Sequence, residues 1–140
     1  MARIDLEQLR HSYLPHPQDD ADYALKQVDL VWDDGGAYAL LGPSGCGKTT
    51  LLNIISGLLT PSEGNILFDG ERVNEKSPEE RQIAQVFQFP VVYDTMTVYD
   101  NLAFPLRNRG VPEQQVDARV RAIAAMTDLT EMLKKKAAGL

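Results

Sequence analysis

Residues 40–50 (LLGPSGCGKTT) bring a bare backbone, a positive charge and two hydroxyl groups together directly after an apolar run. Within them, residues 42–49 fit the pattern G-x-x-x-x-G-K-[ST]. Glycines let such a loop bend tightly, so that successive backbone N–H groups can surround an anion. Lys48 adds a mobile positive charge, and the hydroxyl of Thr49 is a hard oxygen of the kind that Mg²⁺ prefers. The pattern therefore predicts a loop that binds the phosphates of a nucleoside triphosphate with Mg²⁺.

The segments on either side of this loop have the character that such a site requires. Residues 37–41 (AYALL) form a continuous apolar run, which is typical of a strand buried on both faces. Residues 48–59 carry apolar side chains at helical spacing, and Gly57 is placed to end that helix. The positive N-terminal end of the helix favours phosphate binding. The residues expected to contact the nucleotide are Gly42, Pro43, Ser44, Gly45, Cys46, Gly47, Lys48, Thr49 and Thr50.

The rest of the chain predicts a mixture of strands and helices. Four further segments are interpreted as strands: residues 2–14 as an edge strand, residues 23–32 as a half-buried strand, residues 65–70 as a short strand with a turn at Asp69-Gly70, and residues 83–88 as a buried strand. From residue 97 the spacing of apolar residues becomes helical, with Pro112 near a helix start. The first two thirds therefore predict an α/β core, and the last third predicts helices.

Composition limits the class of protein. The chain has 140 residues, of which 44% are apolar and 24% charged, as in a soluble domain with a real core. Its net charge of -6 argues against a general nucleic-acid binder. No apolar run is long enough to span a bilayer, and the first residues carry no secretory signal. The single cysteine, Cys46, is interpreted as a small filler of the loop, and His11 and His16 as surface residues.

Two long stretches resemble the ATPase subunits of ABC transporters: GPSGCGKTTLLNIISGLLTPSEGNILFDG and RQIAQVFQFPVVYDTMTVYDNLAFPLR. The resemblance runs from about residue 24 to residue 140. It implies an α/β fold: a P-loop NTPase core with an antiparallel β edge, the start of a helical subdomain, and an incomplete sheet. It places a nucleotide-binding core in residues 1–96, with the phosphate loop at 42–50 and a glutamine loop at 88–95. Residues 97–140 would be part of the helical subdomain, ending before the family's signature motif.

The resemblance also implies roles for single residues. Lys48 would act on the β- and γ-phosphates of ATP, and Gln88 would contact Mg²⁺ and the attacking water, so that Thr49 and Gln88 are the expected metal ligands. From the residues alone, Gln88 is a polar group at the end of a buried strand, where ligands bind in open α/β sheets. It could equally hydrogen-bond loop backbone. The ring that stacks on adenine is assigned to Tyr13, with Tyr23 as the alternative.

Partners follow from the same resemblance. The region after Gln88 would face the transmembrane permease subunits, and a second ATPase subunit, identical or different, would complete the ATP site. The aromatic residues of this region could instead cap the helical subdomain. The implied location is peripheral, on the cytoplasmic face of the inner (plasma) membrane, without nucleic acid as a partner. The motif sequences most resemble those of importers of carbohydrates, polyols or glycerol phosphate.

Lys134, Lys135 and Lys136 are interpreted as a solvated helix end rather than a lipid contact.

Several motifs of the family do not occur in these 140 residues. There is no Ser-Gly-Gly signature, no apolar strand that ends in Asp-Glu to supply a general base, and no switch histidine. We therefore expect the first part of a longer ATPase, which by itself binds ATP poorly, hydrolyses it negligibly and tends to associate. The alternative is a nucleotide-binding or assembly module that does not turn over ATP.

Overall fold

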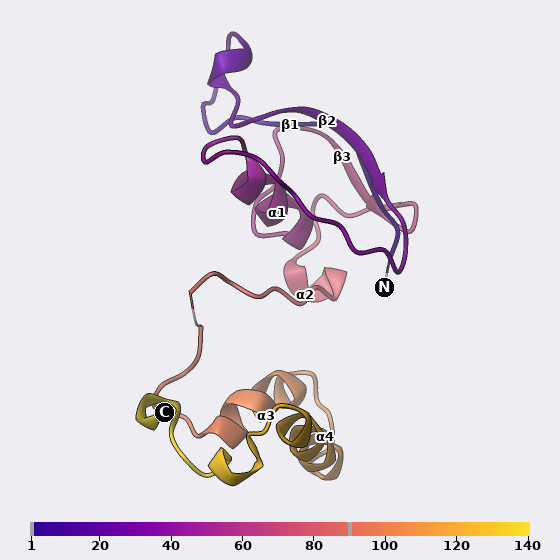
Figure 1. The fold of residues 1–140 in the computed structure, drawn as a ribbon. Coiled ribbons are helices and arrows are strands. Elements are labelled where there is room, and N and C mark those ends of the chain that lie inside the picture. Colours follow the sequence, from indigo (N-terminus) through magenta and orange to yellow (C-terminus); the bar gives the residue numbers. More distant parts are fainter. Residues whose placement is uncertain (1, 90) are drawn as a thin grey trace. The chain divides into compact units, whose positions relative to one another are not determined.

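The computed structural model describes residues 2–89 and 91–140, which form two compact units, Met1–Gln85 and Val86–Leu140 (Figure 1). The sequence placed the boundary between core and helical part near residue 96. The chain between these positions, residues 86–96, has no helix or strand among its described residues. Each unit is described by itself below.

An antiparallel sheet forms the frame of the first unit. Its strands are β1 (Ile4–His11), β2 (Leu25–Trp32), β3 (Glu63–Phe68) and β4 (Glu71–Arg72), in the order β2-β1-β3-β4. The antiparallel β structure expected from the sequence is therefore present. The interpretation of residues 2–14 as an edge strand is wrong, because β1 pairs with β2 on one side and β3 on the other.

A β-bulge explains the loose alternation that suggested an edge. The register of β1 shifts between Leu6 and Leu9, and Gln8 has a left-handed φ of 49°. The extra residue lets Leu6 and Leu9, three positions apart, both point into the core. Opposite the bulge, Gly64 has φ of +89° and leaves room for the backbone of Gln8, which a Cβ would overlap.

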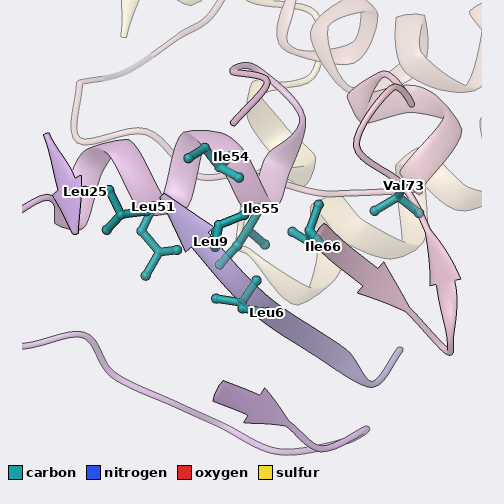
Figure 2. Packing of buried hydrophobic residues seen from close by; sticks show 8 residues of the cluster. All are labelled: Leu6, Leu9, Leu25, Leu51, Ile54, Ile55, Ile66 and Val73. Atoms are coloured by element: carbon teal, nitrogen blue, oxygen red, sulfur yellow. The ribbon is translucent and has the colours of Figure 1, made fainter. Parts of the chain in front are cut away.

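Helix α1 (Lys48–Ser56) packs against this sheet and ends at Gly57, as predicted. Gly57 has φ of 93°, and its N–H closes the last turn on Asn53 and Ile54. The core lies between α1 and the strands, and Figure 2 shows its side chains interleaved. Burying such side chains contributes roughly 1.5–3 kcal/mol each to folding. The cluster consists of Leu6, Leu9, Leu25, Leu51, Ile54, Ile55, Ile66 and Val73.

The two buried strands expected at 37–41 and 83–88 do not form. Both segments are described, and both are irregular; Leu41 is 93% exposed and Val86 98% exposed. A continuous apolar run becomes a parallel strand only when neighbouring strands hydrogen-bond its backbone and helices cover its faces. The four strands of the sheet supply no such neighbour to either segment.

The turn predicted at the end of β3 is confirmed. Asp69 and Gly70, both with positive φ (51° and 81°), form the turn that joins β3 to β4. The segment after β4 forms a short helix, α2 (Pro78–Arg81), which begins with a capping box between Ser77 and Glu80. Helix α2 ends at Arg81, whose side chain is buried.

The second unit is helical, with α3 (Val98–Asn108) and α4 (Glu113–Met126) followed by the 3-10 turns η2 (Thr130–Met132) and η3 (Ala137–Gly139). Its own core comprises Val98, Ala103, Val116, Val120, Ala124 and Leu133. The helix expected over the last residues is wrong: Lys134, Lys135 and Lys136 are exposed between the two 3-10 turns, where Lys136 bridges to Thr97. Within residues 2–89 and 91–140, no helix combines the length and apolar character needed to cross a membrane.

Candidate nucleotide-binding site

The glycine-rich loop leads directly into α1, as the sequence predicted. Gly45 and Gly47 adopt φ of +83° and +97°, values that L side chains rarely adopt. At Gly47 there is also no room, because a Cβ would lie 2.8 Å from the carbonyl oxygen of Ala24. A Cβ at Gly42 would lie 2.7 Å from Sγ of Cys46. The side chain of Cys46 therefore lies against Gly42 across the bend, although it is exposed to solvent.

An open pocket of about 410 Å³ lies at this end of α1. Most of the predicted nucleotide contacts line it, whereas Gly42, Pro43 and Cys46 do not. The bend is closed by a hydrogen bond of 3.3 Å from the Cys46 N–H to the Pro43 carbonyl. The lining residues are Ala24, Ser44, Gly45, Gly47, Lys48, Thr49 and Thr50.

The pocket has the donors that a phosphate group needs. The first N–H groups of a helix lack partners within the helix, and here the capping position is Gly47, which has no side chain to accept from them. Lys48 Nζ donates to the carbonyl oxygen of Gly42, so the ammonium group already has an oxygen ligand across the loop. An anion with several oxygens fits this arrangement of amides and ammonium. Thr49 is exposed at the same place and offers a hydroxyl to a hard cation.

Of the two candidate adenine-stacking residues, Tyr13 lies beside the loop. Its hydroxyl is 3.3 Å from Oγ1 of Thr50, and the side chain is 64% exposed. Tyr23 is engaged elsewhere: its hydroxyl donates to Glu63 at 2.8 Å, and the guanidinium of Arg10 lies 3.7 Å from its ring centroid. The geometry favours Tyr13 because its ring is both near the pocket and accessible.

Gln88 is exposed in an irregular part of the second unit, whereas Lys48 and Thr49 belong to the first. The role of Gln88 as a metal ligand stays a prediction. The apolar side chains around Gln88 are exposed: Phe87, Phe89, Val91, Val92 and Tyr93. Tyr93 also packs edge-on against Phe104 at 5.1 Å between ring centroids, so capping of α3 accounts for part of this aromatic content.

Sequence reasoning missed one residue that packs against Tyr13. His11, interpreted as a surface residue, is only 6% exposed and packs against the ring of Tyr13, so that interpretation is wrong. The signal was available, because Leu9 and His11 are two apart on a strand and so share a face. His16 is exposed, as expected.

The bend, the ammonium group and the helix start together define a phosphate-binding loop of the nucleotide-binding kind. The family model described as ABC transporter matches residues 25–139. The chain belongs to this family.

Individual relatives agree with the family. An uncharacterised ABC transporter ATP-binding protein of Bacillus subtilis is 44% identical over 97% of this chain and 35% of its own length. An sn-glycerol-3-phosphate import ATP-binding protein of Rhodopseudomonas palustris is 40% identical over 97% of this chain and 36% of its own length. A trehalose/maltose import ATP-binding protein of Thermococcus litoralis is 47% identical over 81% of this chain and 32% of its own length. The chain thus spans about a third of the length of these relatives.

Proposed function

We propose that this chain provides the ATP-binding part of a subunit that couples ATP binding and hydrolysis to solute import by an ABC transporter. The observation that carries the proposal is the pocket at the start of α1, where bare amides, the Lys48 ammonium group and the Thr49 hydroxyl converge in a chain of this family. Two similar proteins are named for import of sn-glycerol 3-phosphate and of trehalose/maltose, which supports a solute among sugars and glycerol phosphate. We include polyols in the proposed class because the motifs resemble those of polyol importers.

Each residue has a part in this proposal. The amides of residues 44–50 and Lys48 bind the phosphates of ATP, Thr49 holds Mg²⁺, and Tyr13 stacks on adenine. Mg²⁺ held there would supply positive charge that neutralises the phosphates. Lys48 exchanges the Gly42 carbonyl for phosphate oxygens when nucleotide binds. Gln88 is proposed as the second metal ligand and as the residue that orients the attacking water.

The partners are transmembrane permease subunits and a second ATPase subunit. Support for the first comes from the exposed apolar side chains that follow Gln88, since exposed aromatic residues are common at protein interfaces. Docking there would place the protein at the cytoplasmic face of the inner membrane as a peripheral subunit. The net charge of -6 does not favour a nucleic-acid partner.

The nucleotide site is tested by titrating Mg²⁺-ATP into the purified protein and its Lys48→Ala variant. We expect the variant to bind at least about tenfold more weakly, because a charge-assisted contact to phosphate is lost. Lys26→Ala, which removes an exposed lysine of β2, is the matched control and should bind as the parent does. Equal affinity of the Lys48→Ala variant and the parent would refute the site.

Binding and turnover need separate measurement. The 140 residues contain no apolar strand ending in Asp-Glu, so we expect this chain to bind ATP weakly without releasing phosphate at a rate typical of such ATPases. Phosphate release at that rate by the purified chain would contradict this expectation. Two results together would favour the alternative of a non-hydrolysing module: the purified chain binds ATP without turnover, and Lys48→Ala leaves solute uptake by cells unchanged.

The solute class is tested by uptake of radiolabelled trehalose, maltose and sn-glycerol 3-phosphate in cells that carry the Lys48→Ala allele. We expect uptake of one of these solutes, or of a related polyol, to fall to background. Unchanged uptake of this whole class would exclude the proposed substrates but leave the nucleotide site intact.

A further inference from the structure

We propose that His11 and Ser62 are positioning residues that hold Tyr13 in the orientation needed to stack on a nucleotide base. The proposal rests on the function above, in which Tyr13 is the stacking residue. Neither residue lines the phosphate pocket. Both lie in the same unit as Tyr13 and the phosphate loop.

The backbone next to Tyr13 is tied down by Ser62, from the turn between α1 and β3. Its hydroxyl accepts a hydrogen bond of 3.1 Å from the Ser12 N–H and donates one of 3.1 Å to the Ser12 carbonyl. The Ser12 hydroxyl in turn donates to the Asp22 carbonyl at 2.6 Å and accepts from the Leu14 N–H at 3.1 Å. The peptide groups on both sides of Tyr13 are therefore fixed by hydrogen bonds.

The ring of Tyr13 is held by His11. The two rings meet edge to face, with centroids 4.6 Å apart and planes at 84°. Nδ1 of His11 is 3.2 Å from the Ser62 hydroxyl, so the same serine that fixes the backbone also orients the imidazole. Burial lowers the pKa of His11, which keeps the ring neutral and able to pack against an aromatic neighbour.

A third contact fixes the outer end of the ring, because the Tyr13 hydroxyl lies 3.3 Å from Thr50 Oγ1. Despite these contacts the side chain remains 64% exposed. Three fixed points combined with an open surface are what a stacking platform requires. A ring that is already ordered loses little conformational entropy when a base stacks on it, so the platform increases affinity for the base and not for the phosphates.

The test separates these two parts of the ligand. Affinities for ATP and for inorganic tripolyphosphate are measured on the purified protein and on variants, since tripolyphosphate has the phosphates and no base. Ser62→Ala and His11→Ala should weaken ATP binding by roughly threefold to tenfold and change tripolyphosphate binding less than about twofold. His11→Phe, which keeps a ring edge beside Tyr13, should restore part of the loss. Ser56→Ala removes another buried serine hydroxyl, bonded within α1, and is the matched control.

Tyr13→Leu distinguishes failure of this proposal from failure of the proposed function. If Tyr13→Leu lowers the ratio of ATP to tripolyphosphate affinity while Ser62→Ala and His11→Ala leave it unchanged, Tyr13 stacks on the base but is not positioned by its neighbours. If Tyr13→Leu itself leaves the ratio unchanged, the stacking role fails and the positioning roles fail with it. An equal loss of both affinities in the Ser62 and His11 variants would indicate a general structural role and would also overturn the proposal.

Discussion

Arg81 Nη1 donates a hydrogen bond of 2.7 Å to the carbonyl oxygen of Ile54, in the last turn of α1. The same guanidinium group donates to the carbonyls of Ile55, Lys76 and Asn74 at 3.0, 3.0 and 3.3 Å, and it is only 7% exposed. A positive charge at the C-terminus of a helix complements the helix dipole. Arg81 therefore stabilises the end of α1 that lies opposite the phosphate loop.

Replacing Arg81 with Met should lower the free energy of unfolding of the first unit by about 2–4 kcal/mol, since several buried carbonyls lose a charged donor. Arg72→Met is the matched control: Arg72 is half exposed and pairs with exposed Glu75, so its loss should cost less than about 1 kcal/mol. Urea denaturation followed by far-UV circular dichroism measures both. Equal costs for the two variants would show that the carbonyls at the end of α1 do not depend on Arg81.

Two glycines of the phosphate loop differ in their surroundings, and this difference predicts different costs of substitution. Gly45→Ala meets open space, so only the left-handed φ of +83° opposes it, at about 1–2 kcal/mol. Gly47→Ala meets the Ala24 carbonyl at 2.8 Å as well, and backbone cannot move aside as a side chain can. We expect Gly47→Ala to be the more destabilising by at least about 1 kcal/mol in urea denaturation. If Gly45→Ala were the more destabilising variant, the close approach of Gly47 to the Ala24 carbonyl would be refuted.

The sequence predicted well those elements whose signals are local. The left-handed ends of α1 depend on Gly47 and Gly57, and the hairpin between β3 and β4 depends on the Asp69-Gly70 pair. In each case a residue type that tolerates positive φ occupies a position where the backbone has positive φ. The adenine-stacking role of Tyr13 was assigned from family resemblance rather than spacing, and it stays a prediction.

What could not be predicted depends on distant neighbours. The apolar run 37–41 predicts a buried strand, yet no partner strand among the described residues completes it. The central place of β1 is set by pairing with β3, which lies more than fifty residues along the chain. Strand alternation places His11 on the same face as Leu9, but it does not show that Ser62, from the turn beyond α1, contacts the imidazole. Periodicity carries no information about such long-range contacts.

Stability of the first unit should fall on mild acidification because of His11. Burial places the folded pKa of His11 below its ordinary value of 6.5, so the unfolded state binds the proton more readily. The contribution of neutral His11 to the free energy of unfolding is then fully present above pH 6.5. It decreases as the pH falls from 6.5 toward the folded pKa, by at most about 1.4 kcal/mol per pH unit. Urea midpoints between pH 5 and 8 measure this slope. His11→Phe, which cannot be protonated, should lose this part of the slope, and an identical slope in the two proteins would contradict the assignment.

In the second unit, Asn101 closes the loop that precedes α3. Its Oδ1 accepts from the Tyr93 N–H at 2.9 Å, and its Nδ2 donates to the carbonyls of Tyr93 and Thr97, both at 3.0 Å. Asn101→Ala should free this loop without unfolding α4, because the loop is exposed and its backbone groups can be hydrated. Hydrogen exchange at the Tyr93 amide should rise about fivefold, which corresponds to roughly 1 kcal/mol, while exchange in α4 stays constant.

The loop that Asn101 closes is also the segment proposed to face the permease, so the same variant separates coupling from nucleotide binding. A loosened loop must be ordered again when a partner docks, which weakens docking. Asn101→Ala should therefore reduce solute uptake while ATP affinity remains that of the parent. Asn108→Ala, at the exposed end of the same helix, is the matched control and should change neither quantity. Faster exchange at Tyr93 with undiminished uptake would show that the order of this loop does not contribute to docking.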